Sequence, residues 1–206
     1  MKRIVAEEIA HMEHLYRINL INSCTGYKSG NLVGTCSKEG IENLAIFSSV
    51  IHLGSNPALL GFILRPTTVP RNTFDNLKTT GVFTVNHIHE AMIEDAHHTS
   101  AKYDGSISEF NKTNLTAEYK DEFGAPFVKE SRIQLACNYV NEYFLEENGC
   151  YLIIGAIKSI YLDEKVLCED GFIQLDRAKS ITINGLDGYA LPKLISRQPY
   201  ARPKKD

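Results

Sequence analysis

The sequence has little net charge and no long apolar run. Its 206 residues carry a formal net charge of −3, so no basic field draws the protein to nucleic acid or to an anionic membrane. No apolar stretch approaches the roughly 18 residues that a membrane span requires. Three glutamates interrupt the N-terminal segment, and we therefore expect no signal peptide there. Nucleic acid and membranes are not expected partners.

The five cysteines are odd in number and widely spaced, and none belongs to a C-x-x-C motif. This spacing argues against a disulfide framework and against a zinc or iron–sulfur site. We therefore expect free thiols and a cytoplasmic protein. The histidines add no metal site, because His87 and His89 would share a strand face without a carboxylate or cysteine that completes a ligand set.

Two common functional motifs are also missing. No G-x-G-x-x-G follows a predicted strand, which disfavours a Rossmann-type sheet that binds a dinucleotide. No G-x-S-x-G is present, so Ser-His-Asp catalysis has no support. The composition, with 43% hydrophobic and 23% charged residues, is that of an ordinary globular protein, and we expect residues 1–206 to form a single domain.

Short apolar runs bounded by Gly, Asn or Pro predict most of the structure as strands. The runs are "NLVGTCS", "LAIFSSVIHL", "PALLGFIL", "GVFTVNHI", "RIQLACNYVNEYFL", "CYLIIGAIKSIYLD" and "SITING". The four residues "EENG" have the length of a hairpin loop. Six or seven strands without regular β-α-β alternation predict a mainly β protein, a closed β-barrel with a few helices.

Few helices are expected. One follows residue 71, with Asn72 or Thr73 as N-cap and Gly81 as the residue that ends it. Residues 89–103 are expected to form a second helix, and residues 6–20 a helix that leads into a strand. The polar segment 104–126 is expected to be an irregular excursion or a lid.

The segment "RPTTVPRNTFDNL", residues 65–77, has the composition of a phosphate-binding loop. Two prolines stiffen it, and the following helix would add free N–H groups at its N-terminus. Hydroxyl and guanidinium donors, which a phosphate requires, are supplied by Arg65, Thr67, Thr68, Arg71 and Thr73. The alternative is a surface loop whose arginines pair with carboxylates and whose threonines cap turns.

Polar residues also interrupt the apolar strand before this loop. Asn43 opens that strand, and Ser48 and Ser49 lie within it. Buried hydroxyls need hydrogen-bond partners. These serines therefore either bond to neighbouring backbone or face a polar, planar ligand.

Taken in order, three segments resemble the flavin reductase-like family with the FMN-binding split-barrel fold. They are "KEGIENLAIFSSV", "NPALLGFIL" and "RPTTVPRNTFDNLKTTGVFTVN", and the ordered match runs from residue 34 to residue 86. "CYLIIGAIKSIYL" and "LDGYAL" match later parts of the family pattern more loosely. The resemblance implies a six-stranded antiparallel split β-barrel that forms a homodimer and binds FMN, or FAD, without a covalent bond.

The resemblance also implies where the flavin would lie. The strand from residue 43 to residue 50 would run along the isoalloxazine ring, the loop would hold the phosphate, and residues 86–88 would approach from a neighbouring strand. The implied cofactor-binding residues are Asn43, Leu44, Ala45, Ile46, Phe47, Ser48, Ser49, Arg65, Thr67, Thr68, Arg71, Asn72, Thr73, Asn86 and His87.

The implied function is that of an oxidoreductase whose flavin takes electrons from NAD(P)H or passes them on. We nominate no catalytic side chain, because the flavin carries the chemistry. Cys150 stands where many members have a histidine associated with the reduced nicotinamide. This departure favours a flavoredoxin-like electron carrier as the alternative. A monooxygenase or a redox protein is the expected class of protein partner, and a pyridoxamine-phosphate-oxidase-like barrel could use the same loop for another phosphate ligand.

Overall fold

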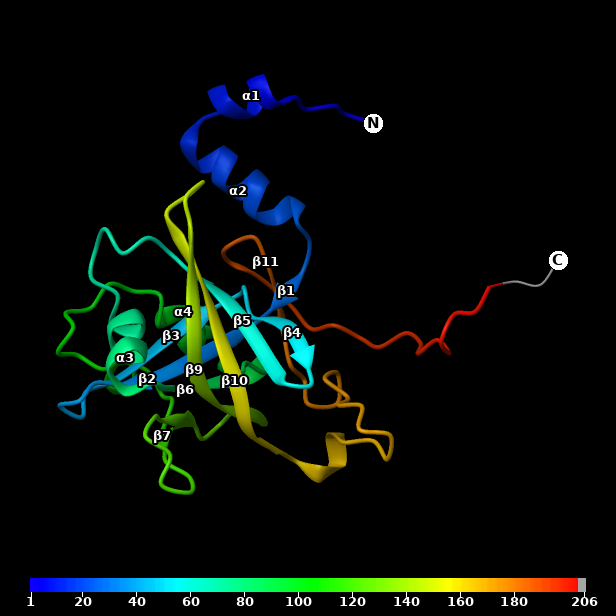
Figure 1. Ribbon diagram of the computed structural model, residues 1–206. Coiled ribbons are helices and arrows are strands. Elements are labelled where there is room, and N and C mark those ends of the chain that lie inside the picture. Colours follow the sequence, from blue (N-terminus) through cyan, green and yellow to red (C-terminus); the bar gives the residue numbers. More distant parts are fainter. Residues whose placement is uncertain (204–206) are drawn as a thin grey trace.

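The computed structural model describes residues 1–203. A seven-stranded sheet forms the body, and every neighbouring pair of strands is antiparallel. Figure 1 shows these strands wrapping around a common centre, with β9 and β10 in front. In spatial order the strands are β3 (Glu42–Phe47), β2 (Asn31–Cys36), β6 (Val82–His87), β9 (Ile133–Leu145), β10 (Cys150–Leu162), β5 (Ala58–Leu64) and β4 (Ile51–Ser55). The mainly β class is confirmed, with seven strands in the main sheet instead of six.

The barrel closes at a seam between β3 and β4. These strands follow each other in the chain but lie at opposite ends of the sheet, and no ladder joins them within the described residues. Instead, the Ser49 hydroxyl donates to the carbonyl oxygen of Ile63 (3.3 Å) and accepts from the backbone N–H of Ile63 (3.0 Å). Phe47 packs edge-on against Phe62, with ring centroids 5.0 Å apart.

The chain bends between β3 and β4, where the sequence predicted one continuous strand. The run "LAIFSSVIHL" was expected to be a single strand, but it is divided between β3 and β4, and residues 48–50 form a corner between them. The corner exists because Ser49 bonds to β5 and so leaves the line of β3.

The helices agree partly with the sequence. α3 (Asn72–Thr80) ends at Gly81, whose φ of 73° is left-handed, as expected. Its N-cap is Arg71 rather than Asn72 or Thr73, and no side chain caps it. The helix expected over 89–103 is shorter and divided into η1 (Glu90–Met92) and α4 (Ile93–His98).

The N-terminal segment folds as two short helices and not as a helix followed by a strand. α1 (Ala6–His11) and α2 (His14–Cys24) contain no buried residue and project from the barrel (Figure 1). At the other terminus, residues 191–203 contain no helix or strand and run away from the barrel. No helix among residues 1–203 has the length and apolarity needed to cross a membrane.

The remaining elements are short. A small three-stranded sheet lies beside the barrel. A two-stranded ladder joins a strand of the excursion 104–126 to the strand that directly follows it, and there are two further short 3-10 helices. They are β1 (Lys28–Ser29), β11 (Thr182–Asn184), β12 (Gly188–Ala190), β7 (Ala117–Glu118), β8 (Phe127–Val128), η2 (Glu109–Lys112) and η3 (Glu164–Val166).

All six residues of β2 are buried, because other parts of the protein pack on both of its faces. Val33 points into the barrel, where it packs with Phe62 and Phe83. Leu32 points to the other face and packs with Phe110. Phe110 belongs to the excursion 104–126, so this segment covers the outside of β2 and β3 as a packed layer.

Candidate functional site

The structure brings the corner 48–50 and the loop 65–71 to the same end of the barrel. Ser49 bonds to Ile63, two residues before Arg65. Ser29 also donates its hydroxyl hydrogen to the carbonyl oxygen of Val50 at 3.1 Å, which ties the corner to β1. Six of the predicted residues therefore lie near one another: Ser48, Ser49, Arg65, Thr67, Thr68 and Arg71.

The loop itself is held by its own arginine. Arg71 is half-buried, and its Nε donates to the carbonyl oxygen of Pro66 at 3.3 Å. Arg65, Thr67 and Thr68 are exposed. Across residues 1–203, neither arginine forms an ion pair with a carboxylate. Both positive charges therefore stay available to an anion, together with the first N–H groups of α3.

A buried polar network lies beneath this loop. The Asn43 side-chain amide donates to the hydroxyls of Thr35 (3.2 Å) and Thr73 (3.1 Å). Asn76 of α3 also donates to Thr35, at 3.1 Å. Asn43 and Thr73 therefore join β3 and α3 and support the start of the helix from inside. Asn72, at the first position of α3, is half-buried.

The outer edge of β3 forms a hydrogen bond with the carboxylate of Glu109. The backbone N–H of Leu44 donates to Oε2 of Glu109 at 2.8 Å, and burial raises the pKa of this carboxyl. Residues of an antiparallel edge strand alternate between bonding to their neighbour and facing outward. Ala45 therefore faces β2, while Ile46 presents its backbone N–H and carbonyl at the outer edge. The Leu44 side chain is fully buried in the core.

Asn86 and His87 lie on β6, which is two strands from β3 because β2 lies between them. The Asn86 side chain is buried and accepts from the N–H of Val128 at 3.0 Å, so it holds β8 against the barrel. It also donates to the carbonyl oxygen of Leu32 at 3.2 Å. Burial lowers the pKa of His87 to about 4, so its imidazole is neutral at pH 7.

Comparison with known proteins agrees with this geometry. A family model, the flavin reductase like domain, matches residues 24–175. The chain belongs to the flavin reductase-like family. The resemblance found in the sequence is therefore confirmed, and the function of the chain is related to flavin.

Solved structures place the chain within the split-barrel fold of this family. A Shewanella frigidimarina protein assigned as a flavin reductase with a split barrel domain is 45% identical, with a TM-score of 0.94 over 98% of this chain and 100% of that one. Nitrilotriacetate monooxygenase component B from Bacillus cereus is 23% identical, with a TM-score of 0.83 over 96% and 98%. Flavoredoxin of Desulfovibrio vulgaris is 19% identical, with a TM-score of 0.73 over 85% and 92%. The last two likenesses concern the fold alone.

This flavin reductase-like chain also has an aromatic row that the sequence reasoning did not place. Tyr151 pairs with Leu64 on one side and with Phe144 on the other, so the three side chains share a face. Phe74 of α3 packs against Tyr151, with centroids 5.0 Å apart. The signal was present: Phe144 and Tyr151 are equally distant from the ends of the "EENG" loop, and a hairpin pairs such positions.

A separate cleft opens at the other end of β10. It has a volume of about 840 Å³, and Lys120, Arg132 and Tyr161 are among its lining residues. No predicted cofactor-binding residue lines it. Lys120 is already bonded to the carboxylate of Glu118 (3.0 Å) and to Gln134 (2.7 Å), so it has little capacity left for a ligand. Residues 1–203 contain no cluster of three or more potential metal ligands.

Proposed function

We propose that the chain binds FMN at the corner 48–50 and the loop 65–71, and acts as an oxidoreductase. Bound flavin would supply the chemistry, by taking electrons from NAD(P)H and giving them to an acceptor. The observation that carries this proposal is the pair of arginines, Arg65 and Arg71, which have no carboxylate partner in the described chain.

The residues of this site would have distinct roles. Arg65 and Arg71 would neutralise the phosphate, and Thr67 and Thr68 would donate to it from exposed positions. The half-buried Ser48 and the backbone of Ile46 would meet the polar edge of the ring, since the Leu44 N–H is already bonded to Glu109. Asn43 and Thr73 would position β3 and α3 through their buried hydrogen bonds.

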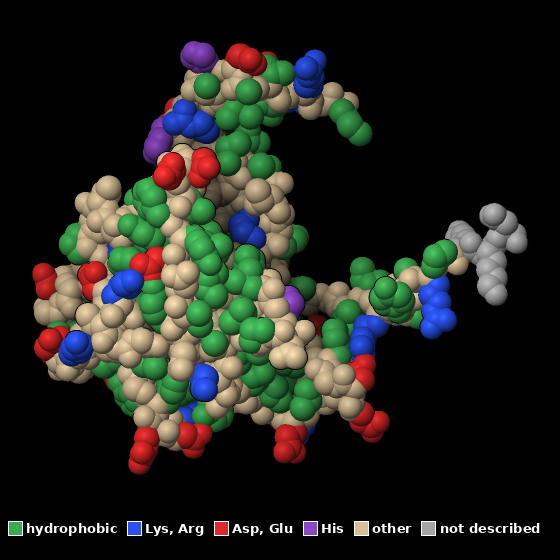
Figure 2. All heavy atoms as spheres, viewed as in Figure 1, with side chains coloured by type: hydrophobic (Ala, Val, Ile, Leu, Met, Phe, Trp, Pro, Cys, Tyr) green, Lys and Arg blue, Asp and Glu red, His purple; other side chains and the backbone are tan. Residues whose placement is uncertain are grey.

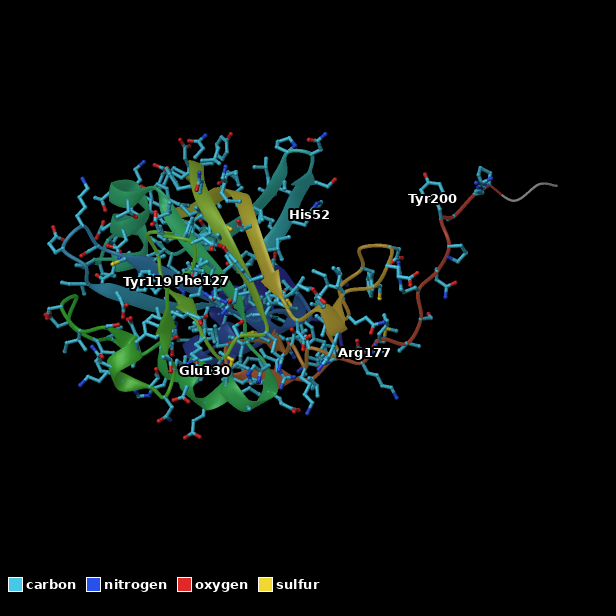
Figure 3. All side chains as sticks on the ribbon, turned by 90° about the horizontal axis from the view of Figure 1, so that it is seen from below. His52, Tyr119, Phe127, Glu130, Arg177 and Tyr200 are labelled. Atoms are coloured by element: carbon cyan, nitrogen blue, oxygen red, sulfur yellow. The ribbon has the colours of Figure 1, made fainter. Side chains whose placement is uncertain are left out.

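An FMN titration with Arg65→Ala and Arg71→Ala tests this site. Each variant loses charge-assisted hydrogen bonds worth about 1.5–3 kcal/mol, and we expect its Kd for FMN to rise roughly 10- to 100-fold. Arg177→Ala is the matched control, because Arg177 is exposed and lies on a different loop, between η3 and β11 (Figure 3). Unchanged affinity in both variants would refute the assignment.

An electron carrier without NAD(P)H turnover is the second candidate. Cys150 lies next to the loop, because the position of a Cβ on the preceding Gly149 is 3.6 Å from Cγ of Pro66. A cysteine thus stands beside the site where family members have a histidine. Anaerobic addition of NADH to the FMN-loaded protein separates the two candidates: loss of the flavin absorbance supports a reductase, and persistent absorbance supports a carrier.

We also propose that two copies associate through the outer face of β4, β5 and β10. Leu53 and Leu152 both lie over Gly61 on this face, and Ile51 is 50% exposed. Figure 2 shows hydrophobic side chains gathered across this side of the barrel. A second copy of the chain would cover them. Light scattering should give the dimer mass, and Ile51→Glu should give the monomer; an unchanged mass in that variant would contradict this interface.

The acceptor and the location are less directly supported. The shared fold with nitrilotriacetate monooxygenase component B favours a monooxygenase, or another redox protein, as the partner that receives electrons. The cytoplasmic location expected from the five unpaired cysteines stays a prediction.

A further inference from the structure

The aromatic row on the β9–β10 hairpin ends in a side chain that the protein does not cover. Leu64 is 2% exposed at one end of the row, and Phe144 is 55% exposed at the other. Tyr151 lies between them and is half-buried. The row therefore begins in the core and ends in solvent.

Only the inner part of this row is covered by α3. Phe74 packs on Tyr151 at a tilt of 32°, and Phe144 also packs on Tyr151, with ring centroids 5.2 Å apart. One side of the Phe144 ring is thus held by Tyr151, while the rest is open. A phenylalanine has no polar group to bond with water, and an open, fixed aromatic ring is a suitable surface for another ring.

This open ring lies close to the proposed phosphate loop. Leu64, the residue before Arg65, is two strands from Phe144, which corresponds to about 10 Å. The turn of the same hairpin also lies beside the loop, because a Cβ built on Gly149 would be 3.6 Å from Cγ of Pro66. A ribose and a base attached to a phosphate in the loop can span a distance of this order.

We propose that Phe144 stacks on the adenine ring of a dinucleotide that is bound beside the loop 65–71. This inference rests on the proposed function and extends it from FMN to ligands that carry an adenosine. The adenine can belong to FAD, bound as cofactor, or to NAD(P)H, bound as electron donor. For FAD, Arg65 and Arg71 hold the phosphates of the dinucleotide itself. For NAD(P)H, these arginines keep the phosphate of FMN, and Phe144 alone contacts the adenine.

The first experiment compares FAD with FMN. Base–aromatic stacking is worth about 1–3 kcal/mol, so Phe144→Leu should weaken FAD binding by roughly 5- to 150-fold and leave FMN binding nearly unchanged. Phe144→Tyr keeps the ring and should behave like the unmodified protein. A merely apolar role for Phe144 would be preserved by leucine, so this pair of variants separates stacking from packing.

Tyr143→Leu is the matched control. Tyr143 lies on the same hairpin, is 56% exposed and pairs with Leu152, so its side chain points to the opposite face. Any effect of this variant on assembly acts on FMN and FAD alike and cancels in the ratio of their Kd values. The ratio should therefore stay unchanged.

The second experiment identifies the source of the adenine. Phe144→Leu can leave the ratio of the Kd values for FAD and FMN unchanged and still raise the KM for NADH. If the KM for reduced nicotinamide mononucleotide then stays the same, the adenine belongs to the electron donor. If neither measurement changes, or if Phe144→Leu instead converts a dimer to a monomer, the inference is wrong. Normal FMN binding in that variant would show that the proposed function survives, whereas failure of the unmodified protein to bind FMN or FAD would overturn both.

Discussion

The bond between Glu109 and Leu44 makes a sharp prediction about stability. Glu109 is 8% exposed, and its Oε2 accepts the backbone N–H of the fully buried Leu44. Glu109→Ala removes a charge-assisted hydrogen bond and leaves a buried amide without a partner. The expected loss in the free energy of unfolding is about 2–3 kcal/mol. For a protein of this size, that lowers Tm by roughly 5–10 °C.

Urea denaturation at pH 7 measures this loss directly. Glu109→Gln keeps an acceptor for the Leu44 N–H and should stay within about 1 kcal/mol of the unmodified protein. Glu94→Ala, at an exposed position of α4, should stay within about 0.5 kcal/mol. If Glu109→Ala lowers the free energy of unfolding by less than about 0.5 kcal/mol, as expected for the control, this carboxylate does not hold the excursion against β3.

The same residue predicts a dependence on pH. Burial raises the pKa of Glu109 above its ordinary value of 4.5, so the folded protein binds this proton more tightly than the unfolded chain does. The part of the free energy of unfolding that comes from protonation of Glu109 is therefore present at low pH, and it is lost as pH rises through the folded pKa. Glu109→Gln lacks this contribution, so the stability of the glutamine variant relative to the unmodified protein should increase with pH. A constant or decreasing difference would contradict the sign.

Two further substitutions test other parts of the structure. Gly155→Ala places a Cβ against the Phe83 ring, too close for an ordinary contact, so we expect about 1–3 kcal/mol of destabilisation in thermal denaturation. Addition of Phe83→Leu should restore part of this loss. Cys150→His should raise the rate at which NADH reduces the FMN-loaded protein, if the missing histidine limits nicotinamide use; an unchanged rate would count against that role.

Much of the sheet could be predicted from local patterns. Runs of apolar residues bounded by Gly, Asn or Pro predicted most strands nearly to the residue, because short runs of this kind between turn-forming residues are typical of strands. The end of α3 was also predictable, since Gly81 supplies the left-handed conformation locally. These features depend on residues close together in the sequence.

The features that were missed depend on distant contacts. The corner at Ser49 forms through a bond to Ile63, and nothing inside the apolar run indicates where it bends. The hydrogen bond between Asn86 and Val128 joins residues that are 42 positions apart in the sequence. The carboxylate that occupies the Leu44 N–H comes from an excursion 65 residues away.

The seam also affects how this barrel can change in evolution. A complete ladder between β3 and β4 would constrain every residue along both edges. Here the hydroxyl of Ser49 makes both bonds to β5. The backbone of the neighbouring corner residues is therefore not fixed by a strand ladder. The same scaffold can accept insertions or exchanges at this corner while the strands behind it keep their pairing.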